Sequence, residues 1–180
     1  MNIVEIKNQL SIRCKNGIGF LLAATIIWSI ITFIFLLPLG INEKNIFMLL
    51  SSGLMFPLAV IISKAIKAEW KVNDHPLGDL GLYLNIAQLM YFPLLFWVFA
   101  KSPEHMVLFF IVITGAHFFP YGWFYHTKAY YIMAPVISIM SMAIGWTMDV
   151  ERLWILPLAM VFLLLILDVW LYIDYKKKCK

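Results

Sequence analysis

Six long apolar stretches divide this chain, and they constrain its fold more than any other feature. They cover residues 18–39, 46–66, 82–100, 106–124, 129–148 and 153–175. Each has about 20 residues, enough for a helix to cross ~30 Å of hydrocarbon. The runs are continuously apolar and lack the two-residue alternation of barrel strands. The sequence therefore predicts an all-α integral membrane bundle of six transmembrane helices, with residues 1–180 forming a single transmembrane domain.

The composition also indicates that most of the chain is surrounded by lipid. The chain has 180 residues, of which 63% are hydrophobic and 13% are charged. A soluble domain carries roughly twice that share of charged residues. A chain of this size could not hide so much apolar surface in a water-soluble globule. We therefore expect the lipid bilayer to be its principal partner.

The basic residues are distributed unevenly between alternate connecting segments, and this asymmetry predicts the orientation. Three of the 14 Lys and Arg residues fall on one side, namely Lys44, Lys101 and Arg152. The other 11 are Lys7, Arg13, Lys15, Lys64, Lys67, Lys71, Lys128, Lys176, Lys177, Lys178 and Lys180. The excess predicts that the N-terminus and the C-terminus are both cytoplasmic. Because these residues flank helix ends, they indicate contact with anionic lipid, and no nucleic-acid partner is expected.

Prolines interrupt four of the predicted spans, at Pro57, Pro93, Pro120 and Pro135. An interior proline removes a helix hydrogen bond and leaves the carbonyl four residues earlier without its usual partner. Transporters use such broken backbone to line cavities. The alternative is a kink absorbed by packing against neighbouring helices. Both interpretations are open at the level of sequence.

Polar side chains are few inside the predicted spans. At 1.5 Å per residue, Asn85 and Gln88 lie about 5 and 9 Å from the cytoplasmic end of their helix. His117 falls near the midplane, and Asp168 lies about 8 Å from the inner face. Since the helices alternate in direction, this shared depth was not guaranteed. An ionisable group in hydrocarbon costs several kcal/mol unless it is paired, hydrated or neutral, and therefore suggests a functional site.

Helical spacing brings some of these side chains onto common faces. Asn85 and Gln88 are three residues apart, and His117, Tyr121 and Tyr125 repeat every four residues. We predict a polar cavity open to the cytoplasm. Its candidate ligand-binding residues are Asn85, Gln88, His117, Tyr121, Tyr125 and Asp168.

Each of these residues also has a structural interpretation. Asp168 could reach headgroup water, and His117 could bond a freed carbonyl. Asn85 and Gln88 could form interhelical hydrogen bonds.

Signatures of enzymes and cofactor sites are missing from the sequence. It contains no HExxH, GxSxG or phosphate-binding loop, so we expect no catalytic residues and no cofactor. Cys14 and Cys179 belong to no CxxC or Cys/His spacing, and His75, His105 and His126 have no ligand spacing. We therefore expect no metal site.

The segments outside the spans carry further expectations. Residues 1–16 lack the pattern of a cleavable signal peptide, and could form a short interfacial helix or an untethered polar tail. The connection at residues 125–128 is so short that the helices on either side must be antiparallel neighbours. A stripe of small residues indicates a close-packing face, with a substrate path as the alternative. It consists of Ala134, Ser138, Ser141 and Gly145.

Two segments, ITGAHFFPYGWFYHTKAYYIMAP and LLAATIIWSIITFIFLLPL, carry a resemblance to a known family. The chain resembles an uncharacterised family of small multi-pass membrane proteins from Gram-positive bacteria, a domain of unknown function. The likeness covers nearly the whole chain, and its most distinctive part is the His-Phe-Phe-Pro-Tyr-Gly-Trp segment. It implies a location in the bacterial plasma membrane and a multi-pass architecture, and it supplies no activity.

Three functions are compatible with these observations. The leading hypothesis is a membrane protein that binds or transports a small molecule or lipid, with His117 and Asp168 as proton-coupled groups. The second is a membrane-embedded enzyme acting on a lipid or isoprenoid, with His117 as acid/base and Asp168 as its orienting partner. The third is a non-catalytic partner subunit. The missing motifs favour a protein that is not an enzyme, and its size suits a monomer or a homodimer.

Overall fold

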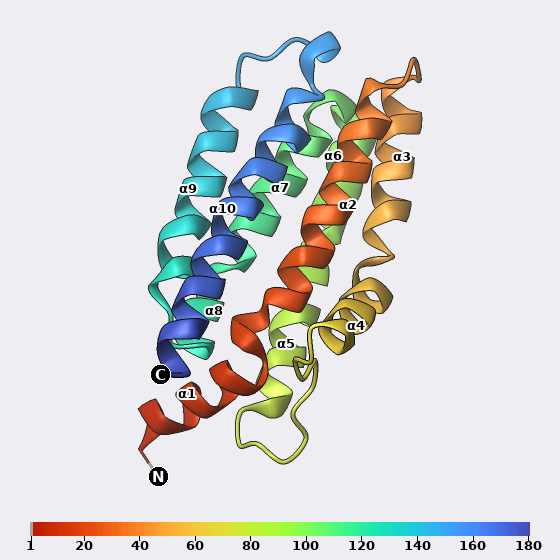
Figure 1. The fold of residues 1–180 in the computed structure, drawn as a ribbon. Coiled ribbons are helices and arrows are strands. Elements are labelled where there is room, and N and C mark those ends of the chain that lie inside the picture. The colour runs from red at the N-terminus through yellow and green to blue at the C-terminus, as the bar shows by residue number, and fades with distance from the viewer. Residues whose placement is uncertain (1) are drawn as a thin grey trace.

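Within residues 2–180, which the computed structural model describes, every regular element is a helix (Figure 1). Three long helices are continuous: α2 (Ile18–Leu36), α9 (Lys128–Gly145) and α10 (Ile155–Lys178). Three pairs are interrupted: α3 (Ile41–Ser52) with α4 (Met55–Ala65), α5 (Gly78–Leu89) with α6 (Phe92–Lys101), and α7 (Met106–His117) with α8 (Phe119–Phe124). Helix α1 (Ile3–Arg13) precedes them, and the 3₁₀ turns η1 (Lys15–Gly17), η2 (Pro103–His105) and η3 (Val150–Arg152) connect elements.

These helices have the length and composition of membrane spans. Five helical stretches are long and apolar enough to cross a membrane, or six if α3 and α4, which are bent by 43°, count as one span. The all-α prediction is therefore confirmed, with five to six helices capable of spanning. The helices depart from the predicted ranges mostly at polar ends. For example, α10 continues to Lys178 because lysines suit the last turn of a helix, where the dipole is negative.

Helix α2 packs between α10 and α4, and α7 packs along α9. The short connection between α8 and α9 makes these helices neighbours, as expected. Small residues allow the α7–α9 approach: a Cβ on Gly145 would lie 2.8 Å from Leu108, and one on Gly115 would lie 2.7 Å from Ile137. Ala134 and Ser141 of the stripe are buried as well. The stripe is thus a packing face, as predicted.

Helix α5 is packed much more loosely than the rest of the bundle. It has no buried residue, whereas most residues of α2 and α7 are buried. In the other half of the same span, α6 buries Leu95 and Val98. This span is therefore anchored to the core at two positions of α6 and at none of α5.

Both chain ends lie at one end of the bundle, and α1 crosses that end beneath the long helices (Figure 1). Asn2 caps α1 in a reciprocal pair with Glu5, whose carboxylate accepts the Asn2 N–H. The chain turns sharply into α2 through three residues of positive φ: Lys15, Asn16 and Gly17. Gly17 is required there because a Cβ would lie 2.8 Å from the Tyr125 ring. The N-terminal segment is thus a helix, not a tail.

Candidate functional site

A cavity of about 470 Å³ lies where α5 fails to pack, at the end of the bundle that α1 crosses. Its walls come from α2, α3, α4, α5, α7 and α8, with one residue each from α6 and α9, and residues of α1 and of the α4–α5 loop also line it. Pockets that bind small molecules commonly have volumes of about 300–1,000 Å³. The cavity is therefore large enough for a ligand.

Three helix interruptions surround this cavity. Helix α3 gives way to α4 at Gly53, α5 to α6 beyond Leu89, and α7 to α8 at Phe118, and all three residues line the cavity. Each interruption is followed within four residues by a proline, which has no N–H to continue the helical ladder. The prolines at these sites therefore stand in the first turn of a new helix, not in a helix interior as we expected. Pro135 alone among the four remains inside a continuous helix, α9.

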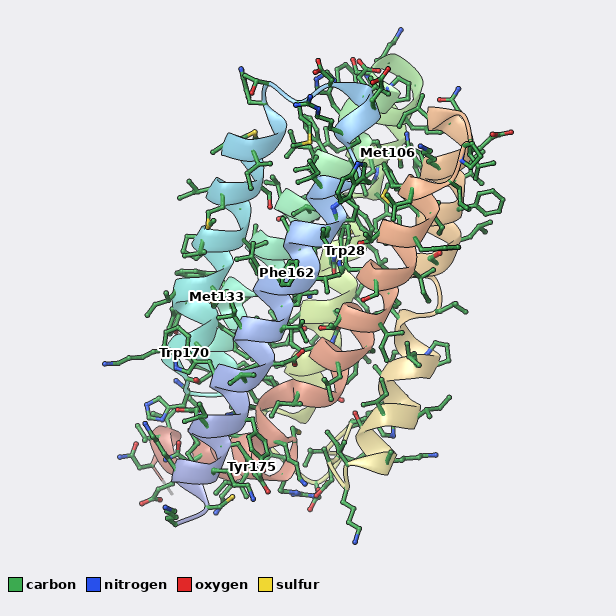
Figure 2. The ribbon with its side chains drawn as sticks, turned by 45° about the horizontal axis from the view of Figure 1, so that its top comes forward. Trp28, Met106, Met133, Phe162, Trp170 and Tyr175 are labelled. Carbon is green, nitrogen blue, oxygen red and sulfur yellow. The ribbon has the colours of Figure 1, made fainter. Side chains whose placement is uncertain are left out.

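The cavity walls are mostly apolar and aromatic. At its inner limit, the Trp28 and Phe110 rings lie 5.4 Å apart, and Phe92 meets Phe110 edge to face. Figure 2 shows Trp28 roughly midway along the bundle, with Met106 toward one end and Tyr175 toward the other. Beyond Trp28 the core closes, because Ile31 and Met106 are fully buried. The cavity therefore extends about halfway through the bundle and does not form a pore.

Two of the predicted polar residues line the cavity from α5. The Asn85 side-chain amide donates to the Gly81 carbonyl at 2.8 Å. The Gln88 amide donates across to the Thr114 hydroxyl of α7 at 3.4 Å, and Thr114 donates to the Phe110 carbonyl. Asn85 and Gln88 thus share the cavity face of α5, as their spacing predicts. The Gln88–Thr114 bond is the interhelical contact that the structural interpretation anticipated.

Three further predicted residues form an aromatic column on α7 and α8. The His117 and Tyr121 rings lie 5.3 Å apart edge to face, and Tyr121 stacks on Tyr125 at 6.0 Å. Tyr130 of α9 joins the column and donates its hydroxyl to the Asn16 carbonyl at 2.9 Å. All four side chains line the cavity. The stacking follows from the four-residue spacing, and Tyr130 is a member that the spacing alone did not reveal.

Asp168 lies elsewhere. It is buried on α10, and its Oδ2 accepts a hydrogen bond from the Thr25 hydroxyl of α2 at 3.0 Å. It is not among the residues that line the cavity, and its Oδ1 has no partner within the described part of the chain. The structure therefore brings together five of the six predicted residues and leaves Asp168 in the α2–α10 packing. The six residues were grouped by their depth along the predicted helices. Depth does not determine which neighbouring helix a given face of α10 packs against.

Helix α1 and the α4–α5 loop close the cavity at the end of the bundle. Leu10 and Cys14 line it from below, and Val72 does so from the loop. The two segments are tied by Arg13, which binds both oxygens of Glu69 at 2.7 Å.

Arg13 also holds Asp74, with a shortest contact of 2.8 Å. The hydrogen bond to Arg13 lowers the pKa of Asp74 below its ordinary value, and both carboxylates raise the pKa of Arg13. A depressed carboxyl pKa means that the pair stabilises the fold above the ordinary pKa, and that this contribution is lost as the pH falls through the lower, folded value. Asp74 is therefore ionised at neutral pH and can pair with Arg13 there. Burial raises the pKa of the Cys14 thiol to about 12, so this thiol stays protonated there.

A second polar cluster anchors the chain ends, and sequence reasoning missed it. The Lys178 ammonium donates to the Ser11 hydroxyl and the Tyr125 carbonyl, both at 2.9 Å, and pairs with Asp174 at 2.8 Å. Asn16, which is fully buried, bonds Ser11 and donates to Asp174 at 3.0 Å. The sequence predicts that Lys178, like the other basic residues at helix ends, contacts anionic lipid. The available signal was the four-residue spacing of Asp174 and Lys178, which favours an ion pair on one helix face.

The cavity carries little charge. None of its lining residues is acidic, and Lys71, an exposed residue of the loop, is the one lysine or arginine among them. Residues 2–180 contain no group of His, Cys, Asp and Glu side chains able to hold a metal ion. The site can therefore offer apolar surface, aromatic faces and a few uncharged hydrogen-bonding groups.

Comparison with known proteins supplies a family. Residues 3–174 match a family described as a family of unknown function (DUF7010), so the chain belongs to that family. No curated protein and no solved structure matches the chain.

Proposed function

We propose that this member of a family without an assigned function is a membrane protein that binds a small apolar molecule or lipid. The single observation that carries the proposal is the partly open cavity of about 470 Å³, which is lined by apolar and aromatic side chains and by a few polar groups. This is the common character of small-molecule sites. Empty apolar space of this size inside a bundle costs packing energy, and a bound ligand would restore it.

The cavity distinguishes this proposal from the alternatives. A partner subunit with no ligand needs only a closed, packed bundle, and α5 is left unpacked here. A conducting pore needs a path through the bundle, and the core beyond Trp28 is closed. An acid/base enzyme built on His117 and Asp168 needs a shared site, and only His117 lines the cavity. Binding is therefore better supported than conduction or catalysis.

We further propose that the chain crosses the bacterial plasma membrane six times with both ends in the cytoplasm. The excess of Lys and Arg in alternate segments supports this orientation. The position of both termini at one end of the bundle supports their lying on the same side of the membrane (Figure 1). Reporter fusions at the two termini test it: a reporter active only in the cytoplasm should work at both ends, and activity of an export-dependent reporter at either end would contradict the orientation.

Tryptophan quenching tests the binding itself. Trp28 lines the cavity and is 3% exposed, so a bromine atom that stays in the lipid outside the cavity does not contact it. The signal is the fluorescence of the protein in nanodiscs minus that of its Trp28→Phe variant, titrated with dibromooctadecane. We expect saturable quenching, because the alkane should enter the cavity.

Two matched variants control this experiment. Ala24→Phe fills the cavity from α2 and should abolish the saturable component. Ala87→Phe adds the same group to an exposed position of α5 that does not line the cavity, and should leave the component intact. Equal quenching in both variants, or no saturable quenching in the parent protein, would contradict ligand binding at this site.

A further inference from the structure

Two side-chain oxygens of α5 are left without a hydrogen-bond partner in the cavity wall. Asn85 and Gln88 both line the cavity, and each uses its amide nitrogen in a hydrogen bond within the protein. No hydrogen bond to Asn85 Oδ1 or Gln88 Oε1 is found within residues 2–180. We propose that the cavity binds an uncharged amphiphile whose hydroxyl head donates a hydrogen bond to one of these oxygens. This inference rests on the proposed function and specifies the head group of its ligand.

The hydrogen bonds inside the protein determine which end of each amide is left free. Thr114 uses its one hydroxyl proton to donate to the Phe110 carbonyl at 2.8 Å, so toward Gln88 it can only accept. The Gln88 nitrogen must therefore face Thr114, and Oε1 is the end left over. Asn85 is oriented in the same way, because the Gly81 carbonyl at 2.8 Å can accept only from the amide nitrogen.

The two free oxygens are accessible, unlike other unpartnered groups of the protein. Within residues 2–180, the fully buried side-chain atoms that lack a partner belong to Asn45, Tyr121, Ser141 and Asp168. Asn85 and Gln88 are half-buried, and their oxygens are not among these atoms, so both oxygens retain accessible surface. The two residues are three positions apart and line the cavity from one face of α5.

A wholly apolar ligand would cover these oxygens without bonding to them. A polar atom that loses its water and gains no hydrogen bond costs free energy. A hydroxyl on the ligand can donate to an amide oxygen, whereas an ether or carbonyl oxygen cannot. The ligand's polar head should therefore carry a donor.

Other open groups of the wall can donate, which favours a head that also accepts. The Tyr125 hydroxyl, the His117 ring nitrogens and the Trp28 indole N–H line the cavity, and none has a hydrogen-bond partner in the described part of the chain. Tyrosine and histidine can each donate or accept, and an indole N–H only donates. The wall thus presents both acceptors and donors. A hydroxyl can bond to either kind, while a carbonyl would leave the amide oxygens unpaired.

The wall carries no suitable countercharge for a charged head. No acidic side chain lines the cavity among the residues that the structure describes, so an ammonium group would be buried without an anion. A carboxylate could not bond to the amide oxygens, because it only accepts, and Lys71 is exposed on the loop. Burying an unpaired charge costs far more than burying a hydroxyl that is hydrogen-bonded. An alcohol with an apolar body satisfies these limits.

The ligand would reach the cavity from the bilayer. Helix α5 has no buried residue and therefore does not seal its side of the cavity. Its residues Leu82, Ile86 and Leu89 line the cavity, and each is at least 40% exposed. At the end of the bundle, by contrast, Arg13 ties α1 to the α4–α5 loop. An apolar approach past α5 suits an alcohol dissolved in lipid.

Matched probes test the inference in the Trp28 quenching assay. Dibromooctadecanol carries a hydroxyl, its methyl ether keeps the oxygen without the donor, and dibromostearate and dibromooctadecylamine carry opposite charges. Dissociation constants are expressed as mole fractions of the nanodisc lipid, in which the probes dissolve. One hydrogen bond of ordinary strength changes affinity by about 2- to 10-fold. We expect the alcohol to bind about 2- to 10-fold more tightly than the ether, and both charged probes to bind more weakly than the alcohol.

A double variant removes both oxygens. Asn85→Leu combined with Gln88→Met replaces the amides by apolar side chains of similar size. It should bring the alcohol-to-ether ratio close to one, while dibromooctadecane still binds saturably. Tyr83→Phe removes a polar group of α5 that does not line the cavity and should keep the parent ratio.

The inference is overturned if the parent protein binds alcohol and ether equally, if the double variant keeps the parent ratio, or if a charged probe binds most tightly. If the double variant does not bind the alkane, the two substitutions are measured singly, and an unchanged ratio in both overturns the inference. Saturable quenching of the parent protein by dibromooctadecane in those cases leaves the proposed function standing. If no probe quenches the parent protein saturably, the proposed function itself fails.

Discussion

Tyr121, Tyr130 and Tyr131 make the clearest test of these packing arguments, because replacing each by Phe should change stability in a different way. In Tyr121→Phe the ring remains and only a buried, unpartnered hydroxyl is lost. Leaving such a group unpaired costs about 1–3 kcal/mol. Because the substitution keeps the ring and its contacts, we expect the variant to be more stable than the parent by about 1–2 kcal/mol, the lower part of that range. For a chain of this length this corresponds to about 2–8 °C in Tm.

Tyr130→Phe and Tyr131→Phe serve as controls for the effect of losing a tyrosine hydroxyl. Tyr130 donates to the buried Asn16 carbonyl, so Tyr130→Phe removes a hydrogen bond and should lower stability by about 1 kcal/mol. Tyr131 has no such bond and should change little. Thermal unfolding of delipidated protein in detergent measures all three. The reasoning is refuted if Tyr121→Phe lowers Tm as Tyr130→Phe does, because the hydroxyl would then have a partner in the empty protein.

Three further substitutions test other contacts. Arg13→Ala should detach the loop that follows α4 and increase its cleavage by trypsin in detergent; unchanged cleavage would show that the ion pairs do not hold it. Lys178→Met should lower stability by about 1.5–3 kcal/mol, since it leaves buried acceptors unpaired, while Lys177→Met at an exposed site should be nearly neutral in the same thermal assay. Thr25→Val should cost about 1–3 kcal/mol by removing the hydrogen bond that the Thr25 hydroxyl donates to Asp168, and this cost should vanish in an Asp168→Leu background, as a double-mutant cycle would show.

The parts of the site that could be predicted from sequence lie within single stretches of helix. His117, Tyr121 and Tyr125 stack because a four-residue spacing places them on one face even across the break at Phe118. Asn85 and Gln88 share a face for the same reason. The sequence does not show which faces of different helices contact one another. Helix α10 is apolar on nearly all sides, so its sequence does not indicate which face turns toward α2, and Asp168 was assigned to a cavity that it does not line.

Polar contacts between residues far apart in the chain could not be predicted from the sequence either. The bond from Lys178 to Ser11 joins residues 167 positions apart, and Lys178 stands in a run of lysines that all look like a basic flank. Only the folded chain singles out one of them for burial. The α1 segment shows the same limit: its spacing suggested a helix on the membrane surface, while its actual role in covering the cavity depends on a turn at Gly17 and on pairing with a distant loop.

The helix interruptions explain why a cavity exists at all. Pro57, Pro93 and Pro120 each begin a new helix, and the breaks before them lie around the same space. A continuous α5–α6 helix could pack evenly against α7, as α9 does along its length. The break frees α5 to diverge while α6 keeps Leu95 buried in the core. The side chains of α5 lack contacts that a ligand in the cavity could supply. A ligand that binds there should therefore also order α5. Amide hydrogen exchange in α5 should therefore slow when dibromooctadecane binds. Unchanged exchange would show that filling the cavity does not order the helix that follows the break.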